Sequence, residues 1–199
     1  MAVGAVWYFW TPKYTRVGYQ PAQPVPFSHK IHAGQLGLDC RYCHSFAETA
    51  AHSNIPAAQV CMNCHSQVQK DNPKLEPVRQ AFATGQPVHW VQIHKTPDHA
   101  FFNHAVHVNR GISCVSCHGR VDQMDEVYHA KSHAMKFCLD CHRAPEAHLR
   151  PLDKVTDLGW QAAPKGKESA AQAQLDLGNA LKSQRGVNPP VNNCAGCHR

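Results

Sequence analysis

The residues of this chain with the clearest chemical potential are its ten cysteines, which share one spacing. Every cysteine belongs to a pair separated by two residues, and a histidine follows each pair directly. Two thiols at this spacing can form thioethers with the two vinyl groups of one porphyrin, while the next imidazole binds the iron. The pattern therefore predicts five covalently bound haem c groups with five proximal histidine ligands. The five sites are Cys40/Cys43/His44, Cys61/Cys64/His65, Cys114/Cys117/His118, Cys138/Cys141/His142 and Cys194/Cys197/His198.

Zinc sites and disulfides are the alternative uses of paired cysteines. A four-thiolate zinc site takes two C-x-x-C pairs, and five pairs cannot be divided into such sites without a remainder. A disulfide scaffold gives no reason for a histidine at the same offset five times. Because the haem motif uses every cysteine and leaves none over, haem attachment is the favoured interpretation.

The composition supports an interior built partly from cofactor. Only 8% of the 199 residues are aromatic, and the mean hydropathy is -0.45. Five haems, each a large apolar disc, would supply the buried surface that the side chains lack. Prolines are scattered over 21–97 and disfavour long helices and sheets there. We therefore expect a mainly α-helical and irregular fold with short helices, little sheet and covalent haems forming the core. The best helix candidates are 57–70, 74–84 and 167–184.

The net charge changes once haem is counted. The polypeptide carries a formal +6. Two propionates per haem outweigh the one net positive charge of a ferric porphyrin, so five haems bring the total to about +1 oxidised or about -4 reduced. The basic composition therefore gives no reason to expect an acidic partner or a nucleic acid.

An internal repeat indicates how the chain is organised. The segment 27–32 (FSHKIH) recurs as 102–107 (FNHAVH), and the first and second haem sites of the two halves are displaced by similar distances. The repeat predicts two dihaem modules between a membrane-proximal N-terminal segment and a tail that carries the fifth haem. The predicted boundaries are 1–21, 22–97, 98–150 and 151–199.

Histidines outside the five motifs are the candidates for distal iron ligands. The two H-x-x-H pairs are the strongest, because each precedes a haem site by 7 to 11 residues and its two imidazoles can serve two neighbouring haems. For each of these four histidines, the alternative to iron ligation is a surface or hydrogen-bonded side chain. The favoured distal ligands are His29, His32, His104 and His107, with His94, Met124 and Met135 as further candidates. The remaining histidines are His52, His89, His99, His129, His133 and His148.

An iron with six ligands has no open position for a substrate, so two axial ligands per haem favour electron transfer over catalysis. The sequence contains no Gly-rich phosphate loop, no G-x-S-x-G and no H-E-x-x-H. We therefore expect an electron-transfer protein that is not an enzyme by itself.

The segment 167–184 should form the longest helix of the tail. Ala171, Leu175, Gly178 and Leu181 share one face at helical spacing, which we interpret as ordinary packing. Gly186 and the Pro189-Pro190 pair should end the helix before Cys194.

The first ten residues (MAVGAVWYFW) are apolar and end in aromatic residues, followed by Lys13, Tyr14 and Arg16. This order is typical of the outer end of a membrane helix, where Trp and Tyr lie at the interface. We expect the segment to be the end of a transmembrane anchor, with the start of the helix upstream of residue 1. The alternative is an apolar peptide that docks on a partner subunit.

These features resemble a known family. The F-[SN]-H-x-x-H element before each first haem site resembles class III multihaem cytochromes c. More narrowly, residues 5–160 are similar to the pentahaem cytochrome c subunit of alternative complex III, and the similarity fades over 161–190. The segments that carry this resemblance are 23–30, 40–44, 61–65, 114–122 and 138–143.

The resemblance implies a respiratory or photosynthetic quinol-oxidising complex in the bacterial cell membrane, with the haem domain on the outer, periplasmic side. The protein would receive electrons from an iron–sulfur subunit and pass them to a monohaem cytochrome c or an oxidase. The family also implies one haem with His/Met ligation, through Met124 or Met135. The alternatives are a free periplasmic electron shuttle, which should lack a retained apolar N-terminus, and a multihaem reductase, which would need a five-coordinate haem.

Overall fold

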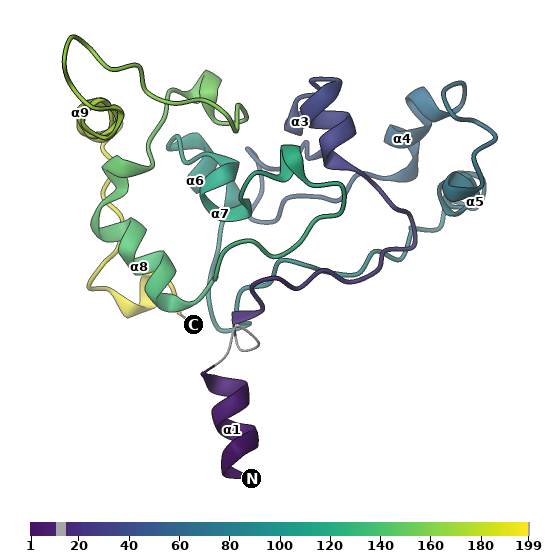
Figure 1. Cartoon of the computed structure of the whole chain (residues 1–199), viewed down its shortest axis with the longest axis horizontal. Coiled ribbons are helices and arrows are strands. Elements are labelled where there is room, and N and C mark those ends of the chain that lie inside the picture. The colour runs from purple at the N-terminus through teal and green to yellow at the C-terminus, as the bar shows by residue number, and fades with distance from the viewer. Residues whose placement is uncertain (11–14, 199) are drawn as a thin grey trace.

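The structure is a computed structural model that describes residues 1–10 and 15–198. Short helices joined by irregular segments form the body, and the chain ends lie on the same side in Figure 1. Within the described residues the only β pairing consists of the isolated bridges Ala100–His198 and Ile112–Leu149. The expected helical and irregular fold class with little sheet is confirmed.

The helices are brief, and every haem motif lies on or beside one. The α-helices are α1 (Ala2–Phe9), α3 (Cys40–Cys43), α4 (Ala58–His65), α5 (Glu76–Thr84), α6 (His104–Asn109), α7 (Cys114–His118), α8 (Met135–Arg143) and α9 (Ala170–Gln184). The π-helix is η1 (Lys30–Gln35). The 3-10 turns are η2 (Pro73–Leu75), η3 (Val121–Gln123), η4 (Pro145–Ala147), η5 (Leu152–Lys154) and η6 (Cys194–Gly196).

Two of the expected helices are shorter than the sequence suggested. The helix expected over 57–70 ends at His65, and Gln69 adopts a positive φ of 55° that a continuing helix would not allow. The helix expected over 74–84 begins as the turn η2 and becomes α-helical only from Glu76, with Pro77 in its first turn. Gly85, in the left-handed region, ends it.

The apolar side chains form only small clusters. Val25, Ala58, Val78 and Ala81 pack together where α4 meets α5. A second group, which includes Leu149 and Val155, is buried near α9 and the segment 149–162. Because so few apolar side chains are buried, contacts outside these clusters must also hold the segments of the body together.

Helix α9 packs on η4, but its buried face differs from the expected one. Gly178 and Leu181 are buried as expected, whereas Ala171 and Leu175 are exposed and Ala173 takes the inner position. Polar contacts to η4 and its neighbours set the rotation of the helix. Gln174 Nε2 donates to the Leu149 carbonyl at 2.8 Å, and Lys182 Nζ pairs with a Glu146 oxygen at 3.1 Å.

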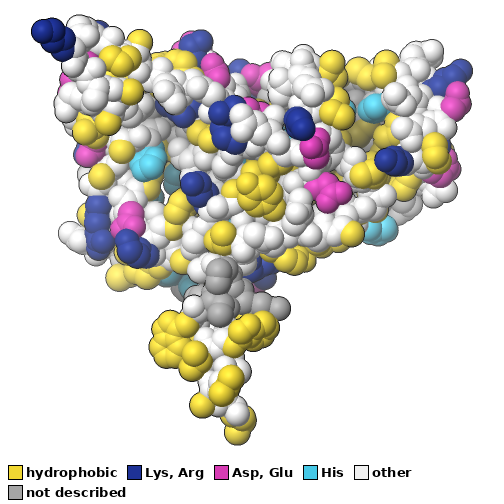
Figure 2. All heavy atoms as spheres, in the orientation of Figure 1, with side chains coloured by type: hydrophobic (Ala, Val, Ile, Leu, Met, Phe, Trp, Pro, Cys, Tyr) yellow, Lys and Arg dark blue, Asp and Glu magenta, His cyan; other side chains and the backbone are white. Residues whose placement is uncertain are grey.

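The N-terminal helix α1 projects from the body (Figure 1), and Figure 2 shows apolar side chains over it. Trp7 is 55% and Trp10 80% exposed. In the described residues, no helix combines the length and the apolar character that crossing a membrane requires. Lys13 and Tyr14 lie outside the described residues. Arg16 lies with its guanidinium 4.4 Å from the centre of the Tyr19 ring.

An N-cap fixes the start of α6. The Asn103 side-chain oxygen accepts from the Val106 amide at 3.2 Å. In the first repeat Ser28 makes the equivalent bond, with its hydroxyl accepting from the Ile31 amide at 3.2 Å. The two repeats therefore begin their histidine-bearing turns in the same way with different cap residues.

The contact between α9 and η4 predicts the effect of Gly178→Ala. A Cβ at this position would collide with the Glu146 backbone, which cannot move as a side-chain end could. We expect Gly178→Ala to destabilise the haem-loaded protein by about 1–3 kcal/mol, measured by thermal unfolding. Gly4→Ala in α1 is the matched control, because nothing lies within 4 Å of its Cβ position. Equal melting of both variants and the parent would contradict the packing described.

The N-cap predicts a second pair of variants. Asn103→Ala should lower stability by about 1 kcal/mol, because the Val106 amide loses its acceptor. Asn103→Ser should retain most of the stability, since serine serves as the cap at the same place in the first repeat. Thermal unfolding of the loaded protein measures both, and a serine variant as unstable as the alanine variant would show that the cap is not the cause.

Candidate haem-binding sites

The five C-x-x-C-H motifs are numbered here in chain order, from site 1 (Cys40, Cys43 and His44) to site 5 (Cys194, Cys197 and His198). Short helices position most of them. At site 1, Asp39 caps α3 through its side chain, which accepts from the Arg41 amide at 2.9 Å. Arg41 in turn binds the Asp39 carboxylate at 2.8 Å and lowers the pKa of that group to about 2. The charged cap therefore stabilises α3, which is only one turn long.

The ten attachment cysteines differ in exposure. Most of them are half-buried, and the three exposed ones are Cys64, Cys138 and Cys194. The polypeptide therefore encloses the thiols of sites 1 and 3 more completely than it encloses those of sites 2, 4 and 5.

Cys64 of site 2 is exposed, whereas Cys61 of the same motif is partly buried. Ala58 and Cys61 of α4 pack against the cluster around Val78 of α5, whereas Cys64 is exposed. The reason is the rotation of the helix: Cys64 lies about 120° round the axis from Ala58, on a side that α5 does not cover. Burial raises the pKa of Cys43, and nearby thiols including Cys64 add to the effect, so Cys64 still lies near site 1. Thioether formation at Cys64 stays a prediction from the motif.

The two H-x-x-H motifs have the same local geometry. In the first, the Phe27 ring stacks on His32 at 4.4 Å and stands edge-on to His29 at 4.8 Å, with interplanar angles of 26° and 87°. One phenylalanine therefore fixes both imidazoles. In the second motif, Phe102 lies 4.6 Å from His107 at 27° and 4.7 Å from His104 at 86°.

Each histidine of these motifs faces one proximal histidine. The pairs join residues that are distant in sequence, and each motif serves two sites. The ring-centre distances and interplanar angles are 6.4 Å and 2° for His29–His44, 6.1 Å and 59° for His32–His65, 6.4 Å and 10° for His104–His118, and 6.1 Å and 31° for His107–His142.

These distances suit a metal ion between the rings. An imidazole nitrogen binds a transition metal at about 2 Å and lies about 1 Å from its ring centre, so two rings on opposite sides of one metal have centres about 6 Å apart. Rings in direct contact would lie closer together. The residues present therefore fit a haem iron held from both sides by histidine.

A fifth pair involves a histidine that the sequence did not single out. His99 lies 5.4 Å from His198 at 28°, the shortest of the five separations. The Ala100–His198 bridge and a 2.6 Å hydrogen bond from the Phe101 amide to the Cys197 carbonyl bring the two segments together. His99 stands outside both H-x-x-H motifs. No local pattern reveals a contact between residues 99 positions apart.

Backbone carbonyls orient most of the paired rings. A ring Nδ1 held by a carbonyl leaves Nε2 for a metal, which is the usual arrangement of histidine ligands. The partners are Asn54 for His44, Val68 for His65, Pro190 for His142, His99 for His198, Ser28 for His32, Ala51 for His104 and Asn103 for His107, at 2.7–3.3 Å.

Partial burial lowers the pKa of four of the paired rings, those of His29, His104, His107 and His118, which favours their neutral form. Burial, with the nearby His44 and His32, lowers the pKa of His29 to about 4. Burial also lowers the pKa of His118 well below its usual range. The Nδ1 atom of His29 is buried and has no hydrogen-bond partner among the described residues. Neutral imidazoles with an available lone pair are the form that binds a metal.

Three further histidines gather beside site 3. The rings of His94 and His129 lie 5.2 Å apart, and those of His129 and His133 lie 4.7 Å apart. The His94 ring stands 4.4 Å from His118 at 83°. This distance is too short for an intervening metal, whereas His104 faces the same ring nearly in parallel. The His133 ring lies 6.3 Å from His118 but at 87°, so His104 is the one of these three neighbours that is both about 6 Å away and nearly parallel.

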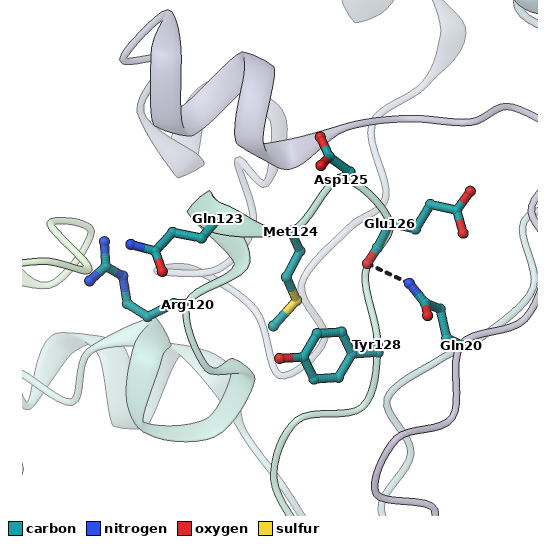
Figure 3. A pocket seen from close by; sticks show the side chains of 7 residues that line it. All are labelled: Gln20, Arg120, Gln123, Met124, Asp125, Glu126 and Tyr128. Carbon is teal, nitrogen blue, oxygen red and sulfur yellow. Dashed lines mark hydrogen bonds between the residues drawn. The ribbon is translucent and has the colours of Figure 1, made fainter.

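The two candidate methionines occupy different environments. Met124 is 6% exposed and lines a cavity of about 590 Å³, where Figure 3 shows its side chain beside Tyr128. Met135 is 60% exposed at the start of α8. Because all five proximal rings face histidine rings, the structure brings histidines rather than these methionines opposite the proximal ligands. Methionine ligation stays a prediction from the family resemblance.

The ring pairs are the recurring unit of these sites. In residues 1–10 and 15–198 there is no group of three or more His, Cys, Asp or Glu side chains that could hold a metal ion. Haem iron takes four ligands from the porphyrin, so a pair of histidines is the full contribution required from the protein.

Comparisons with known proteins agree with this geometry. Residues 25–84 match the family described as cytochrome c7 and related cytochrome c. The chain is 29% identical over 182 residues to the multihaem cytochrome c subunit of a menaquinone reductase from Nitratidesulfovibrio vulgaris, covering 90% of this chain and 78% of the relative. The chain is therefore similar to multihaem cytochromes c over most of its length, and this similarity implies covalently bound haem c.

Proposed function

We propose that the protein is an electron-transfer cytochrome with five haem c groups, each attached at one C-x-x-C-H site and held between two histidines. The observation that carries the proposal is the set of five ring pairs, one for each proximal histidine. The distal partners are His29, His32, His104 and His107, as the spacing predicts, together with His99.

The chain's own residues hold the cofactors and close their axial positions. The cysteines would anchor each porphyrin, and the carbonyl bonds to Nδ1 keep most of the imidazoles in one orientation. When bound, haem supplies one-electron redox chemistry at potentials set by its axial ligands and surroundings. With histidine on both sides of each site, no axial position is left for a substrate, which favours conduction over catalysis.

We further propose that the protein works within a membrane complex in which another subunit carries out the quinol chemistry. The relative is a menaquinone reductase subunit by name, and the apolar helix α1 carries exposed aromatic residues of the kind found at membrane interfaces. The partners would include an iron–sulfur subunit and a monohaem cytochrome c, with the haem domain on the periplasmic side. Alternative complex III is the specific complex that the sequence resemblance favours.

The fifth ring pair predicts the effect of His99→Ala. Removal of this imidazole should turn one low-spin haem high-spin, because an axial ligand of site 5 is lost. Electron paramagnetic resonance and the absorption spectrum measure the change. His89→Ala is the matched control, since His89 is exposed and lies outside the five pairs. Intact mass should show five haem units in both variants. A fully low-spin His99→Ala protein would contradict the assignment, and fewer than five haems in the parent would contradict the count.

The proposed place in a complex predicts where quinol activity resides. The purified subunit should accept electrons from small reductants yet show no quinol oxidation, because its described residues form closed histidine pairs. The assembly extracted from membranes in mild detergent should reduce an external cytochrome c with quinol. Quinol oxidation by the subunit alone would refute the proposal, and so would recovery from membranes as a lone monomer. The lone monomer would instead support a free shuttle.

A further inference from the structure

We infer that the five haem sites form one linear series in space, in the order 2–1–3–4–5, with sites 2 and 5 at its two ends. The inference rests on the proposed haem attachment and adds the arrangement of the sites. Four junctions define the order, and side-chain or backbone contacts support each one.

Sites 2 and 1 meet through the first H-x-x-H motif. His29 faces site 1 and His32 faces site 2, and these residues are three positions apart at the start of η1. A direct bond joins the two attachment loops. Asn63, between the cysteines of site 2, donates to the hydroxyl of Tyr42, between the cysteines of site 1, at 3.1 Å.

Sites 1 and 3 meet through the segment 50–54. The Asn54 carbonyl binds Nδ1 of His44, the proximal residue of site 1, at 2.7 Å. In the same segment, Ala51 accepts from the His104 amide at 3.0 Å and lies 3.1 Å from the Nδ1 of that ring. One short stretch of backbone thus contacts the proximal histidine of site 1 and the distal histidine of site 3.

A second contact joins the cysteine sides of sites 1 and 3. Cys40 lies 3.9 Å from the Thr156 carbonyl, and the Ser113 hydroxyl, next to Cys114, donates to the Val155 carbonyl at 2.6 Å. Val155 and Thr156 are consecutive residues, so one stretch of backbone contacts the attachment segments of both sites. The cysteine sides of sites 1 and 3 are therefore held on the same short segment, 155–156.

Sites 3 and 4 repeat the relation between sites 1 and 2. His104 faces site 3, and His107, one turn along α6, faces site 4. The His133 ring Nε2 lies 3.2 Å from the Cys117 carbonyl of site 3. The same His133 ring lies 5.8 Å from the ring of Phe137, the residue before Cys138 of site 4.

Sites 4 and 5 meet at the C-terminal segment. The Pro190 carbonyl, four residues before Cys194, lies 3.1 Å from Nδ1 of His142, the proximal residue of site 4. Gly196, between the cysteines of site 5, packs on the same Pro190, since a Cβ built at Gly196 would lie 3.0 Å from the Cβ of Pro190.

The arrangement of the helices agrees with these junctions. From right to left, Figure 1 shows α4 with site 2, α3 with site 1, α7 with site 3, and α8 with site 4 near the C-terminus. The two modules are therefore joined back to back through their first sites, so that the second site of the first module forms an end. Sites 2 and 5 are the two ends of the series, and each has one neighbouring site instead of two.

Iron positions in the loaded protein test the order directly. A crystal structure with anomalous scattering at the iron edge should show five iron atoms, each assigned by its thioether bonds. Irons 1 and 3 should be neighbours, and irons 2 and 5 should be the farthest apart. Adjacent irons 2 and 5, or separated irons 1 and 3, would overturn the order while leaving the proposed function intact. Missing irons would instead count against the proposed function.

Two matched variants test the order in solution. His104→Met and His32→Met each exchange one distal imidazole for a thioether, which raises the potential of that haem. A centre reduced earlier disfavours reduction of its neighbours, because it carries one more negative charge. Potentiometric titration followed by electron paramagnetic resonance should show two perturbed haems beside site 3 for His104→Met. His32→Met, at the end of the series, should perturb one. Equal numbers of perturbed haems would refute the linear order.

Discussion

The imidazole pair is the interaction on which the rest of this structure depends. Each pair joins segments that are separated in sequence by at least 14 residues, as for His104 and His118, and by as many as 99, as for His99 and His198. The apolar clusters around Val78 and Leu149 are small by comparison. A chain with few buried apolar side chains can therefore adopt a defined arrangement if a ligand bound between the rings supplies the missing free energy and apolar surface.

The short helices follow from this constraint. A helix of four or five residues, such as α3 or α7, is not stable by itself, because nucleation costs more free energy than so few hydrogen bonds contribute. Caps and long-range backbone contacts hold these turns where the rings need them. The π-helix η1 and the α-helix α6 differ in type, yet Phe27 and Phe102 place the paired histidines in the same way. The local geometry of the rings is thus repeated more closely than the helix that carries it.

A series of sites with closed axial positions suits conduction between partners, and the similarity to a multihaem subunit of a menaquinone reductase supports the same interpretation. The duplicated motif explains how such a series is built. Each H-x-x-H element places its two histidines opposite the proximal histidines of two sites, and the segment 155–156, which contacts both Cys40 and Ser113, connects the two duplicated units. The tail then adds one further site through the contact of Pro190 with His142.

The sequence by itself predicted the attachment chemistry, since C-x-x-C-H is a local pattern in which three nearby residues would perform the whole task. It also predicted the fold class and the existence of helices over 74–84 and 167–184, because proline positions and apolar periodicity act over short distances. The prediction of the inner face of α9 was wrong in part. Ala173 is buried instead of Ala171 and Leu175, because bonds from Gln174 and Lys182 to distant residues set the helix rotation. Only the tertiary structure left Cys64 exposed while it covered Cys61, because the packing of α5 decides which side of α4 faces inward. Only the tertiary structure, likewise, placed His99 opposite His198, chose His104 over His94 beside His118, and set the neighbours of each site. These features depend on contacts between segments far apart in the chain, and no local spacing encodes such a distance.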